Sequence, residues 1–177
     1  MRWRGLIING WGEDAPTSAA GTAALLVLLV LLAAGSAFGQ QLTVQTEDGK
    51  STVLARADVE SLPHIKVTTS VSGSSATFEG VLLRAVLEKA GVGFGETLKG
   101  KRLASCLLVE ATDRYRVLFA LPELDPAFTD KQILLAFLKD GKALDDKEGP
   151  YRIVVPDEKR MARWVRQVTT LKIVEVQ

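Results

Sequence analysis

Short segments in which apolar and polar residues alternate recur along the chain, and each predicts a strand with one face against a core. The alternation is clear in Leu42–Thr46, in His64–Thr68 and in the last segment, Leu171–Val176. An Asp-Gly pair at 48–49 joins the first of these to Ser51–Leu54, and such a pair is typical of a tight β-hairpin turn.

The middle of the chain predicts a second antiparallel pair and a more apolar strand. Leu103–Ala111 and Tyr115–Leu121 flank a polar turn at 112–114. One face of the second strand carries Tyr115, Val117, Phe119 and Leu121. Ile133–Leu138 is nearly continuous in apolar residues, as expected of a strand in the middle of a layer. A further β-branched run, Ile153–Val155, follows a Gly-Pro turn, and the serine-rich segment 72–75 is predicted to be a loop.

Helical spacing is clearest in Val81–Ala90, which follows Phe78-Glu79-Gly80. The apolar residues on one face of this helix are Leu83, Val86, Leu87 and Ala90. Gly91 fits the position that ends a helix. Ala55–Leu62 predicts one or two further helical turns, ended by Pro63.

A basic amphipathic helix is predicted over Asp157–Arg166, directly after Pro156. Three cations would lie on neighbouring turns of this helix: Lys159, Arg163 and Arg166. The residues that would face the core are Met161, Trp164, Val165 and Val168. Together the predicted elements favour one α+β domain with a mostly mixed sheet and two or three helices.

The N-terminal residues are predicted to be a targeting segment. Arg2 and Arg4 give a basic start, an apolar run covers 23–34, and small residues lead to Gly39. This pattern predicts a signal peptide over residues 1–39 and a mature domain over 40–177, in the periplasm or secreted. The alternative is an uncleaved signal anchor, which would place the domain at a membrane. Cys106 is the only cysteine, so a lipoprotein anchor and an internal disulfide are both excluded.

Several short motifs occur in an informative order. The first group is Phe78-x-Gly80-Val81-x-Leu83 with its helix to Gly91, then Asp113-x-Tyr115 at the start of a strand. The second group is Leu135-Ala136, Asp140-Gly141-x-x-Leu144, Gly149-Pro150-x-Arg152, Val154-Val155-Pro156 and Arg163-Trp164. This order resembles the oxidoreductase molybdopterin-binding domain, from about Leu42 to the C-terminus. The resemblance implies a single mixed-sheet domain of sulfite-oxidase molybdopterin-binding type.

The resemblance to sulfite-oxidase-like enzymes implies a molybdenum site, in which the metal is held by a pterin dithiolene and by one cysteine. In those enzymes the cysteine lies in the segment before the Gly-Val-x-Leu helix. Here the corresponding segment, His64–Thr77, contains no cysteine. Cys106 follows the helix, in a predicted strand, where we expect a small buried hydrophobic residue. His64 is the only histidine and has no second ligand at metal spacing, so we expect it to be structural and predict no metal site.

The candidate cofactor-binding residues are the cations near the C-terminus and two residues of the family motif: Arg152, Lys159, Arg160, Arg163, Arg166, Asp113 and Tyr115. Arginine forks suit phosphate or carboxylate, so the cations predict a site for a small anion, such as a pterin phosphate. The alternative is a solvated basic face neutralised by acidic neighbours: Asp157, Glu158 and Glu148. Equally, Asp113 fits a turn and Tyr115 fits core packing.

The sequence leaves two functions open. In one, an exported molybdopterin-dependent oxidoreductase transfers oxygen atoms or electrons and meets a redox partner. In the other, a cofactor-free relative binds a small anion or a partner protein through a basic cleft. A formal net charge of +1 argues against nucleic acid as a partner, because nucleic-acid-binding domains are usually strongly basic.

Overall fold

The structure is a computed structural model that describes residues 41–175, apart from residues 72 and 157. The predicted signal peptide, residues 1–39, lies outside the described residues. Within the described residues, no helix is both long enough and apolar enough to span a bilayer. Two sheets account for most of the regular structure, and short helices connect them.

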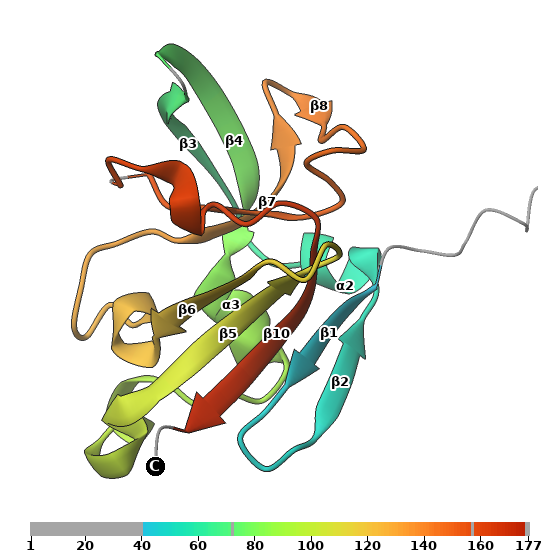
Figure 1. Ribbon diagram of the computed structural model, residues 1–177. Helices are drawn as coiled ribbons and strands as arrows, with labels where there is room; N and C mark the ends of the chain where they lie inside the picture. The colour runs from blue at the N-terminus through green and yellow to red at the C-terminus, as the bar shows by residue number, and fades with distance from the viewer. Residues whose placement is uncertain (1–40, 72, 157, 176–177) are drawn as a thin grey trace, which may run out of the picture. The chain divides into compact units, whose positions relative to one another are not determined.

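The first sheet has the strand order β2-β1-β10-β5-β6. Its strands are β1 (Leu42–Gln45), β2 (Ser51–Leu54), β5 (Ser105–Ala111), β6 (Arg116–Ala120) and β10 (Val168–Glu175). The C-terminal strand β10 lies between the two predicted hairpins, parallel to β1 and antiparallel to β5 (Figure 1). Both hairpins are confirmed, and the parallel pair makes the sheet mixed.

The second sheet is antiparallel and has the order β3-β4-β7-β8, with β9 also paired to β7. Its strands are β3 (His64–Val71), β4 (Ser74–Leu82), β7 (Leu134–Lys139), β8 (Lys142–Ala143) and β9 (Arg152–Val154). Gly80 lies at a register shift between β4 and β7. A Cβ atom added there would lie 2.3 Å from the Leu135 carbonyl oxygen, so only glycine permits the two strands to approach this closely.

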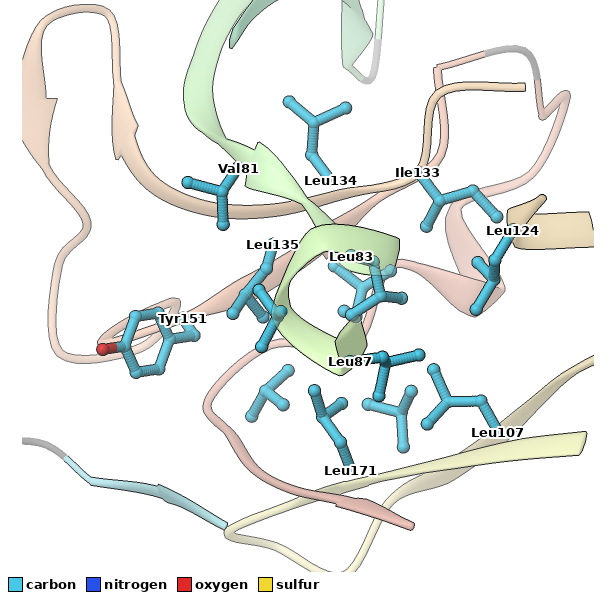
Figure 2. Packing of buried hydrophobic residues seen from close by; sticks show 14 of the residues in the cluster. Val81, Leu83, Leu87, Leu107, Leu124, Ile133, Leu134, Leu135, Tyr151 and Leu171 are labelled. Atoms are coloured by element: carbon cyan, nitrogen blue, oxygen red, sulfur yellow. The ribbon is translucent and has the colours of Figure 1, made fainter. Parts of the chain in front are cut away.

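Helix α3 (Leu83–Lys89) supplies the centre of the core. Leu83 and Leu87 are fully buried and point from the helix towards residues of both sheets (Figure 2). These neighbours include Leu107 and Leu171 from the first sheet and Leu135 from the second. Gly91 ends the helix with a φ of 96°, as its predicted position requires. Helix α3 therefore packs against residues of both sheets.

The remaining helices are short. They are α2 (Arg56–Glu60) and the 3-10 turns η2 (Gly95–Thr97), η3 (Gly100–Ala104), η4 (Leu121–Leu124) and η5 (Met161–Arg163). Helix α2 confirms the predicted turns after the first hairpin. The prediction of an α+β fold with a mixed sheet is therefore confirmed.

Two local predictions near the centre of the chain are wrong. Phe78 to Leu82 belong to strand β4, so the helix predicted from Val81 begins at Leu83. Ser74 and Ser75, predicted to lie in a loop, extend the same strand. The pairing of β4 with both β3 and β7 holds these residues in extended conformation and outweighs their local preferences.

The predicted basic helix over Asp157–Arg166 is also wrong, because within its described residues only Met161–Arg163 are helical, as one 3-10 turn. Beyond this turn, the residues at 164–165 also bond to β9 and to the residue that follows it. Val165 accepts a hydrogen bond from the Ile153 amide at 2.8 Å. The Trp164 indole donates to the Val155 carbonyl at 3.0 Å. These contacts accompany the burial of Trp164 and Val165, which was predicted, although the segment is not the predicted α-helix.

Candidate functional site

A polar cleft of about 250 Å³ lies between the turn that follows β5 and the segment 161–167. It brings together three of the predicted site residues: Asp113, Tyr115 and Arg166. Lys147 and Trp164 also line it. Lys147 was not predicted, because it lies in a loop and nothing in its local sequence marks it.

The wall of the cleft is held by hydrogen bonds from the family motif. The Asp113 Oδ1 accepts a hydrogen bond from the Tyr115 amide at 2.9 Å, so Asp113 makes the turn and also faces the cleft. The Tyr115 hydroxyl donates to the Ala162 carbonyl at 2.7 Å and ties the two sides together. Tyr115 is 47% exposed, so core packing is not its role.

The cleft carries a net positive charge. Arg166 and Lys147 are exposed, and neither side chain makes an ion pair or hydrogen bond with another described residue. Asp113 is the opposing charge among the lining residues. Two cations and one carboxylate leave a net charge of +1 among the lining residues, which also include Tyr115 and Trp164. Such a site suits a small oxyanion.

Arg152 is not in the cleft but behind it. Its guanidinium is buried, donates to Glu148 at 2.5 Å, and lies over the rings of Phe78 and Trp164 at 5.4 and 5.5 Å from their centroids. Lys139 approaches the same Glu148 carboxylate at 3.6 Å. Arg152 therefore supports Trp164, which lines the cleft, and does not reach a ligand there.

Arg163 is held by two carboxylates. It donates to Glu158 from Nε at 2.6 Å and to Glu123 from Nη1 at 3.2 Å, and its Cζ lies 4.6 Å from the centroid of the Phe119 ring. Burial alone would lower the pKa of Arg163, but its hydrogen bonds to these two carboxylates outweigh the effect of burial and raise the pKa. The acidic neighbours anticipated from the sequence thus include Glu158, whereas Glu123, 40 residues away, gave no local signal.

The last two predicted cations face solvent. Lys159 and Arg160 are exposed and make no ion pair or hydrogen bond with any residue that the structure describes. The cations therefore do not converge: Arg166 lines the cleft, Arg152 and Arg163 sit in separate carboxylate clusters, and Lys159 and Arg160 are solvated.

The segment in which a molybdenum-ligating cysteine is expected forms the β3–β4 hairpin, and no residue of it is a cysteine. Cys106 lies on β5, in the other sheet, and is half-buried, so the expectation of full burial is not met. Among the described residues, no group of three or more His, Cys, Asp and Glu side chains is placed to hold a metal ion. The residues present therefore do not fit molybdenum held by a protein thiolate.

His64 has a structural role, as expected. Its Nε2 lies 2.9 Å from the Glu60 carbonyl and its Nδ1 lies 3.3 Å from the Glu79 carboxylate. Its ring also meets the edge of Phe137, with centroids 5.1 Å apart. These contacts join α2 to the second sheet, away from the cleft.

Comparison with known proteins agrees with the order of the sequence motifs. The sequence profile of the oxidoreductase molybdopterin binding domain matches residues 40–177. Among solved structures, the crystal structure of the sulfane dehydrogenase SoxCD from Paracoccus pantotrophus is similar, with a TM-score of 0.60 and 21% sequence identity. The similarity covers 77% of this chain and 38% of that chain. No curated protein matches significantly. The resemblance and the sulfite-oxidase-type α+β fold are thus confirmed.

Proposed function

Because the chain belongs to the oxidoreductase molybdopterin binding domain family, we propose that it is an exported domain of this type that binds a small oxyanion in the cleft beside Arg166. The phosphate of molybdopterin is the oxyanion that the family suggests. We further propose that it has no redox activity that depends on thiolate-bound molybdenum. The observation that carries the proposal is the pair of cations, Arg166 and Lys147, that line the cleft and pair with no carboxylate among the residues that the structure describes.

The arrangement favours a tetrahedral or carboxylate ligand over a neutral one. Arg166 offers a planar fork of donors, Lys147 offers a point charge, and Tyr115 lines the same cleft. Hydrogen bonds to charged groups contribute about 1.5–3 kcal/mol each, so removal of the Arg166 guanidinium should lower the affinity for the anion measurably.

The test is calorimetric titration of the full chain with inorganic phosphate. Arg166→Met is expected to weaken binding at least ~10-fold, the equivalent of about 1.4 kcal/mol. Arg160→Met is the matched control, since Arg160 lies in the same segment, pairs with no described residue and does not line the cleft. Equal effects of the two substitutions, or no phosphate binding by the unmodified chain, would exclude the cleft as an anion site.

The proposal on molybdenum is tested separately, on protein purified from a host that makes the cofactor. We expect no stoichiometric molybdenum, because the β3–β4 segment offers no thiolate and Cys106 lies in the other sheet. Fluorescence of oxidised pterin in the same sample would identify the anion as a pterin phosphate. Stoichiometric molybdenum would overturn the proposal that the metal site is lost.

Export is proposed from the N-terminal pattern alone. The basic start, the apolar run and the small residues before Gln40 favour cleavage near Gly39 and release into the periplasm or the medium. Intact mass measurement of the protein from a periplasmic fraction tests this, since cleavage at Gly39 leaves a chain that begins at Gln40. A full-length chain found in the membrane fraction would favour the uncleaved anchor.

A further inference from the structure

Every donor edge of the Arg163 guanidinium is occupied by the chain itself. Nε donates to Glu158, Nη1 donates to Glu123, and Nη2 contacts both carboxylates. The guanidinium lies on the face of the Phe119 ring, and its side chain is 29% exposed. The Nε–Nη2 edge of Arg163 that binds the Glu158 carboxylate can also bind a phosphate, because arginine binds both groups through two parallel N–H donors.

The charges of this cluster cancel. Lys131 lies 3.9 Å from the Glu123 carboxylate, so two cations, Arg163 and Lys131, face two carboxylates, Glu123 and Glu158. An external oxyanion would meet no net attraction here, in contrast to the cleft beside Arg166. Loss of one carboxylate would leave a net charge of +1 and a free edge on the guanidinium.

The two carboxylates are not equally fixed. Glu123 belongs to η4, and its Oε1 also accepts a hydrogen bond from the Ala120 amide at 3.2 Å, which holds it in the capping position of that turn. Within the described residues, the Glu158 carboxylate contacts only Arg163, and its backbone amide bonds to the Val155 carbonyl at 3.3 Å. Glu158 is therefore the exchangeable partner of the pair.

We propose that Glu158 is an internal ligand that occupies an anion site at Arg163, so that an external oxyanion binds there only when Glu158 is displaced or removed. The Glu158 carboxylate is tethered five residues from the Arg163 guanidinium. It therefore competes with an external oxyanion at an effective concentration in the millimolar range or above. The inference goes beyond the proposed function, because Arg163 does not line the cleft.

The experiment follows the Arg163 Nε–H resonance by NMR while inorganic phosphate is added to the full chain. In the unmodified protein this resonance is expected to stay in place at phosphate concentrations that saturate the cleft. In Glu158→Gln it is expected to shift saturably, with an apparent affinity at least ~10-fold higher than in the unmodified protein. In the double variant E158Q/R166M the response at Arg163 should persist, which separates this site from the cleft.

Glu88→Gln is the matched control. It removes a carboxylate from Arg84, whose side chain is 27% exposed and lies over the Phe94 ring as Arg163 lies over Phe119. We expect no phosphate response at Arg84 in this variant. If Glu158→Gln fails to fold, Glu158→Asp keeps the charge on a shorter side chain and should show a partial response at Arg163. The inference fails if Arg163 responds equally in the unmodified chain, if it responds in neither variant, or if Arg84 responds equally in Glu88→Gln.

Discussion

Replacing Glu148 by glutamine would leave the Arg152 guanidinium charged and buried without its carboxylate. The Arg152 side chain is 6% exposed and that of Glu148 is 18% exposed, so water replaces little of the lost interaction. Removing one partner of a buried ion pair costs about 3–5 kcal/mol. We expect the lower figure, about 3 kcal/mol, because the rings of Phe78 and Trp164 continue to stabilise the cation. This is a large part of the stability of a domain, typically about 5–15 kcal/mol.

The assay is urea unfolding followed by tryptophan fluorescence. Trp164 is the only tryptophan after residue 39, and its ring lies against Arg152, so the signal reports on the cluster itself. A loss of about 3 kcal/mol lowers the urea midpoint by roughly 1–2 M at the usual dependence on denaturant. The control is Glu60→Gln, which removes the carboxylate from a pair of the same i,i+4 spacing whose side chains are both 36% exposed. That substitution should cost about 0–1 kcal/mol.

A double variant separates charge from packing. Glu148→Leu combined with Arg152→Met removes both charges and leaves apolar groups of similar size, which is often close to neutral for a buried pair. The double variant should therefore be more stable than Glu148→Gln alone. If Glu148→Gln costs no more than Glu60→Gln, the Arg152 guanidinium is solvated and the account of its role behind the cleft is wrong.

Three other substitutions test separate parts of the fold and the site. Gly80→Ala should cost about 3 kcal/mol or more in unfolding measurements, because the new Cβ would meet the Leu135 carbonyl at 2.3 Å and push two paired strands apart. Burial alone would raise the pKa of Asp125, but hydrogen bonds from two backbone amides and a nearby arginine outweigh it and lower the pKa. The stability that the Asp125 carboxylate contributes is thus present above its unfolded pKa and is lost as the pH falls through its lower folded pKa. In Asp125→Asn, the free energy of unfolding should therefore fall less steeply below about pH 4. Tyr115→Phe removes the hydrogen bond to the Ala162 carbonyl and should cost about 1 kcal/mol while weakening phosphate binding in calorimetry.

The elements that were predicted well are those whose signal is local. The Asp-Gly turn at 48–49 fixes the first hairpin, and alternation identifies β3, β5, β6 and β10 because one face of each strand is more buried than the other. Strand order is not local. Nothing in Leu171–Val176 indicates that this strand lies between β1 and β5, parallel to one and antiparallel to the other. The strand order depends on contacts between distant residues, such as the packing of Leu171 in the same core as Leu87 of α3, and these are not visible in the strand itself.

The site was predicted in part for the same reason. Asp113 and Tyr115 were identified from a motif, and the structure places both at the cleft with Arg166. The partners of the other arginines come from distant or unmarked positions. Glu123 lies on η4, and Lys147 lies in the loop before β9, so neither their sequence spacing nor their local pattern pointed to the site. Counting cations in one segment therefore overstated how many are available to a ligand.

The difference between Arg163 and Arg166 follows from the backbone between them. On an α-helix, residues three apart lie side by side, and the two guanidinium groups would form one basic face. Here Trp164 and Val165 are both buried and the backbone leaves the helical conformation after the 3-10 turn, so the two arginines reach different surroundings. Arg163 meets Glu123 and Glu158, whereas Arg166 meets the cleft. Under the two proposals, the cleft beside Arg166 is the anion site of the chain as long as Glu158 stays in place. Arg166→Met should then empty the cleft, whereas Glu158→Gln should open a second site at Arg163.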